Sequence, residues 1–295
     1  MVNGSVFPPA EDSVPGVQPA TPSLAAEPPE RKPPPLIELR DVTAAFETQT
    51  VLRHLQLTIH AGESLAIIGE SGCGKSVLLK LLVGLLTPQH GEVLWQGRPL
   101  SAFSRSELTR LRLQMGFVFQ QAALFDSLTV FENVAFGLRL HRGGDEEPIA
   151  QRVRQLLHNV GLSERVLGKM PAELSGGMRK RVAIARALAL DPQVMLYDEP
   201  TTGLDPVMTA VINRLIAQTH QQRRLTTLVV THEMRTVFTC AQRVVMLYPV
   251  GRLAPAEPQI LYDGPPEGLE RTDDPRVRQF VQGQVDYSAS YLLEE

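Results

Sequence analysis

The stretch GESGCGKS, at positions 69–76, contains the first residues whose types and spacing suggest chemistry. It fits the pattern G-x-x-x-x-G-K-[ST], directly after the continuous apolar run SLAIIG (64–69) and before a segment with the pattern of a helix. Glycines at such a turn let backbone N–H groups point inward at phosphates, and the positive end of the helix strengthens the attraction. Lys75 would reach the β- and γ-phosphates of a nucleotide, and the Ser76 hydroxyl would bind Mg²⁺. Rather than a structural turn, we therefore predict a nucleotide-binding loop made of Gly69, Glu70, Ser71, Gly72, Cys73, Gly74, Lys75 and Ser76.

A second candidate is the acidic pair in VMLYDEP, at positions 194–200. Four apolar residues lead into the pair, as expected for a buried strand. An aspartate at the end of a strand beside a phosphate-binding loop can hold Mg²⁺, which is the role we expect for Asp198. Glu199 then stands where a general base for the attacking water is needed. Alone, the segment would be an ordinary acidic strand end, but the loop at 69–76 favours the catalytic interpretation.

The composition of the 295 residues limits the classes of protein that fit. The chain is 43% hydrophobic and 21% charged with a net charge of −3, so we expect no nucleic acid among its partners. The longest apolar run, near 77–86, is interrupted by Lys80 and too short to span a membrane, and the N-terminus lacks the features of a signal peptide. Cys73 and Cys240 fit neither a disulfide framework nor a metal site. We expect a soluble chain in a reducing compartment that reaches a membrane only through a partner.

Elements that could position these residues follow from the periodicity of the chain. Residues 1–35 contain ten prolines and predict a disordered tail, with a proline-rich ligand as the less favoured alternative. A helix should run from Lys75 to about Leu86, and 121–190 should be mostly helical. Strands are expected at 36–46, 55–59, 64–69, 91–97, 194–198, 227–232 and 243–248, capping-box helix starts at 104–107 and 129–132, and a further helix from about 206. The alternation of strands and helices after 190 predicts an α/β fold with a mostly parallel sheet.

Further motifs stand in a fixed order around the loop and the acidic pair, namely GFVFQQ (116–121), LSGGM (174–178), GLDP (203–206) and VVTHE (229–233). Together they resemble the motifs of the ATP-binding-cassette (ABC) ATPases of membrane transporters, over roughly residues 36–250. The resemblance implies a P-loop NTPase fold with an antiparallel N-terminal β region and a helical subdomain inserted at about 121–190. It also implies an ATPase domain at 36–265, followed by a C-terminal tail, 266–295, with a short helix.

The resemblance assigns roles that no residue would carry alone. Gln120 would sense Mg²⁺ and the attacking water, and His232 would contact the γ-phosphate of ATP. Phe46, which is 29 residues before Lys75, lies where the family more often has a tyrosine that stacks on adenine. Asp205, in the loop after the acidic strand, joins the nucleotide-binding residues. Taken singly, these would be ordinary polar or core residues, and only their order favours the functional roles.

The motif at 174–178 raises a separate question, because it looks like a second phosphate site. Ser175, Gly176 and Gly177 begin a helix whose N-terminal amides can bind a phosphate. In the family that phosphate belongs to the ATP held by the other subunit, so the resemblance implies a head-to-tail homodimer. Met178 replaces the glutamine common in the family, and we expect ATPase activity to survive this change.

Met178, together with the segments 121–136 and 274–283, is similar to one subfamily, the ATPases of the Mla (maintenance of lipid asymmetry) lipid transporters. This resemblance implies a transmembrane permease and an MCE-domain lipid-binding protein as partners, in some systems a STAS-domain regulator, and a place on the cytoplasmic face of a bacterial inner membrane. Three phenylalanines fall where such ATPases receive a short permease helix, and core packing is about equally expected for each: Phe125, Phe131 and Phe136.

The C-terminal region leaves two points open. Asp274 could cap a helix with Pro275 in its first turn, placing Val277, Phe280 and Val281 on one face. That face could pack on its own domain or, by resemblance, clasp the opposite subunit. The segment 248–264 is longer than the short hairpin usual in these ATPases, and the sequence suggests no role for it.

Two alternative functions remain. The first is an ATPase for an amino-acid or other polar-solute importer, which the Mla resemblance disfavours. The second is an ABC ATPase that acts on DNA or ribosomes rather than in transport. The 100 residues from Lys75 to Ser175 leave no room for the coiled-coil arm typical of that group.

Overall fold

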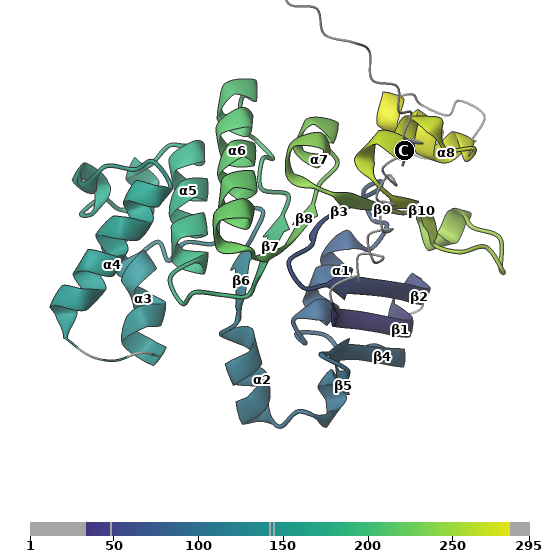
Figure 1. Cartoon of the computed structure of the whole chain (residues 1–295), viewed down its shortest axis with the longest axis horizontal. Helices are drawn as coiled ribbons and strands as arrows, with labels where there is room; N and C mark the ends of the chain where they lie inside the picture. Colours follow the sequence, from purple (N-terminus) through teal and green to yellow (C-terminus); the bar gives the residue numbers. More distant parts are fainter. Residues whose placement is uncertain (1–33, 48, 142, 144, 284–295) are drawn as a thin grey trace, which may run out of the picture. The chain divides into compact units, whose positions relative to one another are not determined.

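The computed structural model describes residues 34–47, 49–141, 143 and 145–283 (Figure 1). The predicted tail at 1–35 lies outside these residues apart from Pro34 and Pro35, and so does the end of the chain after Gly283. Within the described residues, no helix combines the length and the hydrophobicity that a membrane span needs.

Two sheets form the framework of the described residues. The first is antiparallel with the order β2-β1-β4-β5 and contains β1 (Pro35–Phe46), β2 (Gln49–His60), β4 (His90–Trp95) and β5 (Arg98–Pro99). The second has the order β10-β9-β3-β8-β7-β6 and contains β3 (Ser64–Ile68), β6 (Met115–Val118), β7 (Val194–Asp198), β8 (Thr226–Val230), β9 (Arg243–Leu247) and β10 (Ile260–Gly264). All its neighbours pair in parallel except β9 and β10. The expected α/β fold with an antiparallel N-terminal region is confirmed.

The central strand β3 shows why its sequence is continuously apolar. Leu65 and Ile67 face a core that also contains residues of the first sheet and of the helix α1 (Lys75–Leu82). Ala66 and Ile68 face the opposite side, where Val237 and Val277 cover them. Because alternate side chains are buried on both faces, no polar position interrupts the strand.

The remaining helices lie beside the strands or pack against other helices (Figure 1). They are α2 (Arg105–Arg112), α3 (Val130–His141), α4 (Glu146–Asn159), α5 (Gly176–Ala187), α6 (Pro206–Arg223), α7 (Met234–Cys240) and α8 (Pro275–Gln282). Short 3₁₀ helices occur at Leu100–Ala102, Glu164–Val166, Pro171–Glu173, Val250–Arg252 and Pro266–Arg271. The helices α3, α4 and α5 contact one another and share one hydrophobic core with α6. They supply the mostly helical content predicted for 121–190.

Three predicted helix starts are confirmed by their caps. Ser104 accepts a hydrogen bond from the Glu107 amide, while the Glu107 carboxylate accepts one from the Ser104 amide, which is a capping box at the start of α2. Thr129 and Glu132 exchange the same pair of bonds at the start of α3. The Asp274 carboxylate accepts a hydrogen bond from the Arg276 amide at the start of α8.

The predicted bounds were wrong at several strands and at one helix. The helix α1 ends at Leu82, and not near Leu86, because Gly84 turns the chain in a left-handed conformation at φ 65°. The strand β4 ends before Gln96 and Gly97, which both have positive φ and form the turn into β5. The strand β2 begins six residues before the predicted start at 55.

Two strands, β6 and β10, were not predicted, because their sequences lack a recognisable strand pattern. The strand β6 has four residues, one of which is Gly116, where a Cβ atom would lie 2.3 Å from the Met195 sulfur. The strand β10 is an edge strand whose residues are all partly or fully exposed, so it lacks a clean alternation of buried and exposed residues.

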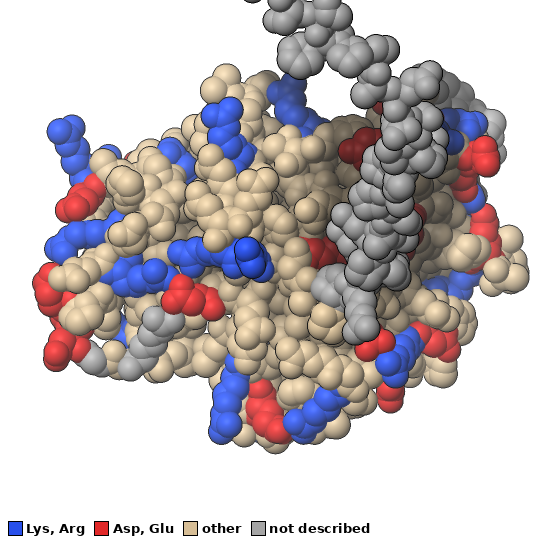
Figure 2. Space-filling model, in the orientation of Figure 1, with Lys and Arg blue, Asp and Glu red and all other residues tan. Residues whose placement is uncertain are grey.

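Charge is mixed on the face of the molecule that Figure 2 displays. Lys and Arg side chains lie among Asp and Glu side chains over the described residues of this face. The face therefore presents no stripe of a single sign among the residues described.

Candidate functional site

The nucleotide-binding loop (residues 69–76) connects β3 to α1, as the sequence predicts. Gly69 must lack a side chain, because a Cβ atom there would lie 2.2 Å from the Leu247 carbonyl oxygen of β9. Gly74 occupies the N-cap of α1 with φ 102°, and no described side chain caps this end of the helix. The first turn of α1 also contains no acidic residue. Its amide donors thus have no anionic side chain as a partner, which suits the binding of a phosphate.

Lys75 holds the loop in shape. Its side chain is nearly buried, and its ammonium group donates hydrogen bonds to the carbonyls of Gly69 at 2.7 Å and Glu70 at 2.8 Å. Burial raises the pKa of the neighbouring Cys73 thiol, although the positive charge of Lys75 opposes this. Cys73 is therefore a neutral, buried side chain, and its contribution to the loop is its small size.

Ser76 and Asp198 meet at the end of the loop. The Ser76 hydroxyl lies 3.3 Å from Oδ1 of Asp198, which closes β7. Burial raises the pKa of Asp198 above its usual range, the Ser76 hydrogen bond lowers it, and the negative charge of Glu199 raises it further. A half-buried carboxylate beside a hydroxyl is a set of oxygen ligands that suits Mg²⁺.

Glu199 follows directly and adopts a conformation that most residues avoid. Its φ is 47°, in the left-handed region, and its amide donates to the Val230 carbonyl of β8 at 2.9 Å. The carboxylate is mostly shielded from solvent and lies 2.9 Å from Nδ1 of the exposed His232. The Thr202 hydroxyl donates to the same oxygen at 3.3 Å. Such backbone strain is typical of functional sites, and here it directs a carboxylate at a histidine.

The five residues Lys75, Ser76, Asp198, Glu199 and His232 thus form one connected cluster at the carboxyl ends of β3, β7 and β8. The carboxyl ends of neighbouring parallel strands are where open α/β sheets bind ligands. Residues from three distant stretches of the sequence are assembled in this way.

Lys180 is a site residue that the sequence analysis missed. Its ammonium group donates hydrogen bonds to the Gln120 carbonyl and, at 3.2 Å, to the Glu199 carbonyl. Burial lowers its pKa, and the charges of Glu199 and Asp198 oppose the shift. The position of Lys180 on α5, on the same face as Gly177 and Ile184, could have indicated its role. A lysine is rarely buried unless it is paired.

The other predicted residues lie apart from this cluster or at its edge. Phe46 ends β1 and is 45% exposed, and Gln120 is exposed after β6. The Asp205 carboxylate accepts hydrogen bonds from the amides of Val207 and Met208, both at 2.9 Å, and so caps α6. This cap gives Asp205 a structural role whatever else it contacts.

The residues of the second predicted phosphate site begin α5. Ser175 is exposed and its hydroxyl accepts a hydrogen bond from the Met178 amide at 3.3 Å. A Cβ atom at Gly177 would lie 2.4 Å from the Met208 side chain, so this glycine allows α5 and α6 to pack closely. In the described part of the chain, the hydrogen bonds of Ser175 stay within α5 and none reaches the nucleotide-binding loop.

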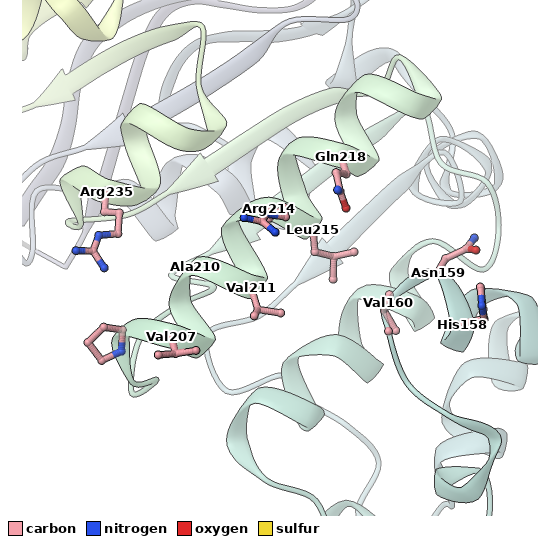
Figure 3. Close-up of a pocket in the computed structure, with 12 residues that line it drawn as sticks. His158, Asn159, Val160, Val207, Ala210, Val211, Arg214, Leu215, Gln218 and Arg235 are labelled. Carbon is pink, nitrogen blue, oxygen red and sulfur yellow. The ribbon is translucent and has the colours of Figure 1, made fainter.

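A hollow of about 680 Å³ lies elsewhere, between the end of α4 and the exposed face of α6 (Figure 3). Val207 and Val211 give it an apolar floor, and Arg214 and Arg235 add positive charge. None of the predicted nucleotide-binding residues lines it, so it is separate from the cluster described above.

Comparisons with known proteins agree with this geometry. A family model described as "ABC transporter" matches residues 52–202, which is more than half of the chain. The chain belongs to the ABC transporter family. It is accordingly an ATPase of the ABC type, as the loop and the acidic pair predict.

Two relatives of this ABC ATPase are named for the transport of different substrates. This chain is 39% identical over 251 residues to the intermembrane phospholipid transport system ATP-binding protein MlaF of Haemophilus influenzae, a match that covers 85% of this chain and 92% of that protein. It is 41% identical over 247 residues to the probable ribonucleotide transport ATP-binding protein mkl of Mycobacterium leprae, covering 84% of this chain and 69% of that protein. The similarity to an Mla ATPase is therefore confirmed.

A solved structure supports the same family assignment. It is a dimeric, post-hydrolysis state of an ATP-binding cassette bound to ADP and Pi, with a TM-score of 0.67 and 34% sequence identity. The match covers 73% of this chain and 97% of that chain.

Proposed function

We propose that this ABC ATPase drives phospholipid transport in a complex of the Mla type. The observation that carries the proposal is the similarity to MlaF over 92% of that protein's length, combined with a site whose residues fit ATP and Mg²⁺. The loop at 69–76 binds the phosphates, with Lys75 as the positive charge, and the exposed Phe46 stacks on the adenine ring.

The Ser76 hydroxyl and the Asp198 carboxylate would hold Mg²⁺. When bound, it neutralises phosphate charge and orients the nucleotide. Asp198 would hold the cation as a carboxylate, and the positive charge would offset the effect of burial, which raises the pKa of Asp198. Gln120, beyond β6, would contribute a further contact to Mg²⁺ and the attacking water.

Glu199 is the general base for hydrolysis. As a carboxylate it can accept a proton from the attacking water, and His232 at 2.9 Å orients it and contacts the γ-phosphate. The strained backbone of Glu199 fixes the carboxylate before the substrate arrives, so less reorganisation is needed during the reaction.

Two chains pair head to tail in this proposal. The exposed Ser175, with the amides of Gly176 and Gly177 that begin α5, faces the ATP held by the loop of the other chain.

An aromatic pair on the helical subdomain is the proposed contact for the permease. Phe125 and Phe136 are 43% and 44% exposed, and their ring centroids lie 4.9 Å apart. Leu140, one turn after Phe136 on α3, is 64% exposed. Phe131 instead packs against the helical core. Exposed apolar clusters of this kind favour a partner surface, and a permease would place the chain at the cytoplasmic face of the membrane.

Ribonucleotide transport is the second candidate, because the relative named for it is 41% identical. Affinity purification from detergent-solubilised membranes, followed by mass spectrometry, separates the two. Phospholipid transport predicts recovery of a permease, an MCE-domain protein and bound phospholipid. Recovery of a soluble solute-binding protein without an MCE-domain protein would contradict the phospholipid proposal and leave the ATPase assignment intact.

A further inference from the structure

The connecting segment between β9 and β10, residues 248–259, has no role in the function proposed above. It leaves β9 beside the nucleotide-binding loop, because the Leu247 carbonyl oxygen lies against the backbone of Gly69. It contains a 3₁₀ turn at Val250–Arg252 and returns to the edge of the second sheet as β10 (Figure 1).

Gln259, the last residue of the connecting segment, is 98% buried, with 2% of its surface exposed. Its Oε1 accepts a hydrogen bond from the Arg53 amide at 2.9 Å. Its Nε2 donates to the Val51 carbonyl at 2.9 Å and to the Cys73 carbonyl at 3.1 Å. The side-chain amide thus uses both N–H donors and its oxygen to join β2 to the loop.

The bond to Cys73 has a direct consequence for phosphate binding. In a trans peptide the C=O and the following N–H point in opposite directions across one rigid plane. By holding the Cys73 carbonyl, Gln259 fixes the direction of the Gly74 N–H, which then points away from Gln259. Gly74 and its neighbours are the donors that a loop of this kind turns toward phosphates.

Arg252 makes a second contact with the same loop. Its guanidinium lies 2.6 Å from Oε2 of Glu70, and both side chains are a little more than one-third exposed. With the Leu247 carbonyl at Gly69, this region of the chain therefore meets the loop at its first, second and fifth residues.

The far side of the connecting segment is anchored on two elements. The Arg53 guanidinium of β2 donates to the carbonyls of Ala254 and Glu257, both at 2.8 Å. Arg276 of α8 pairs with Glu257 at 2.7 Å and lies 5.0 Å from the ring centroid of Tyr248. A segment fixed in this way can hold a loop in one conformation.

We propose that the connecting segment positions the nucleotide-binding loop for phosphate binding, with Gln259 as the main positioning residue and Arg252 as a second. The inference rests on the proposed binding of ATP by that loop. Gln259 does not contact the nucleotide, and it acts through the peptide between Cys73 and Gly74.

The test compares Gln259→Leu with Gln56→Leu, a matched change at an exposed glutamine of β2. The Kd values of the full-length variants for MgADP are measured by calorimetry, and KM and kcat for ATP by phosphate release. Gln259→Leu should raise the Kd and the KM about tenfold, because three hydrogen bonds are lost, and should change kcat much less. Gln56→Leu should match the wild type in all three.

Arg252→Gln provides a variant at an exposed position that does not disturb the core. It should raise the Kd for MgADP about threefold, and Arg252→Lys should restore most of the affinity. If Gln259→Leu does not fold, the Arg252 pair decides the question.

The outcomes separate this inference from the proposed function. If the wild-type protein binds MgADP and a folded Gln259→Leu variant has the same Kd, the positioning role alone is overturned. An unchanged Kd in Arg252→Gln would do the same where Gln259→Leu is not folded. A wild-type protein that binds no nucleotide would overturn both the inference and the proposed function. A fall in thermal stability without a change in Kd would assign Gln259 a purely structural role.

Discussion

At the scale of single residues, Glu199 combines features that an ordinary strand-end carboxylate lacks. It has a strained backbone, it is shielded from solvent, and its carboxylate contacts His232. Each feature holds the carboxylate in one place, which matters because proton abstraction depends on the distance between base and water.

Glu199→Gln should therefore bind ATP with nearly wild-type affinity and hydrolyse it at least about a hundredfold more slowly. The phosphate loop and the Mg²⁺ ligands are unchanged in this variant, so it should accumulate as an ATP-bound dimer. Phosphate release and size-exclusion chromatography with MgATP measure the two effects. Glu92→Gln, at an exposed position on β4, is the control. Near-normal turnover in Glu199→Gln would remove Glu199 from the role of base.

Lys180 should support catalysis by holding the backbone of Gln120 and Glu199 in place. Lys180→Met removes the hydrogen bonds to the carbonyls of Gln120 and Glu199 while conserving length and packing. We expect kcat to fall about tenfold or more, because small displacements of catalytic groups are costly, and the Kd for ATP to change by less than about threefold. Lys180→Arg should recover part of the rate. An unchanged kcat in Lys180→Met would show that the segments around Gln120 and Glu199 keep their geometry without the Lys180 hydrogen bonds.

The site residues predicted from the sequence differ in a physical way from those that the sequence analysis missed. Lys75, Asp198 and Glu199 are recognisable because their chemistry is tied to a local pattern, a glycine turn or an apolar strand. Lys180 and Gln259 act through backbone carbonyls that lie 60 and 186 residues away in the sequence. Such partners become neighbours only once the sheets are assembled, so no local pattern indicates them.

At the scale of elements, the same distinction separates the confirmed elements from the missed ones. The starts of α2 and α3 could be predicted because their capping residues lie within four residues of each other in the sequence. The strand β6 pairs with β7, which lies far along the chain, and β10 pairs with β9 although its own residues are partly or fully exposed. No local pattern of apolar residues therefore indicates either strand. The face of α8 that carries Val277, Phe280 and Val281 packs on its own sheet, the first of the two alternatives that the sequence left open.

The aromatic pair on the helical subdomain carries a prediction of its own. Phe136→Ser should reduce recovery of the permease in affinity purification at least about fivefold, because an exposed aromatic anchor contributes strongly to an interface. The ATPase rate of the isolated chain should not change, since Phe136 does not contact the cluster around Glu199. Phe238→Ser is the matched control, because Phe238 is 49% exposed on α7. Equal permease recovery with Phe136→Ser and with Phe238→Ser would exclude this surface as the contact.

At the scale of the whole molecule, the two predicted phosphate sites imply a composite active site shared by two chains. Lys75→Ala and Ser175→Arg should each be inactive alone, because each change damages both sites of a homodimer. A mixture of the two variants should regain part of the activity, since one of the two sites is then intact in mixed dimers. Phosphate release from titrated mixtures measures this. Full activity of Ser175→Arg alone would contradict the head-to-tail arrangement.

We propose that ATP hydrolysis by this chain drives the movement of phospholipid. The most direct measurement is transfer of a fluorescent phospholipid between the purified membrane complex, reconstituted in vesicles, and acceptor vesicles. Transfer should require MgATP and should be abolished when the complex carries Glu199→Gln. Equal transfer by the wild-type and Glu199→Gln complexes, or no transfer by a complex whose ATPase responds to ribonucleotides, would contradict phospholipid transport driven by this ATPase.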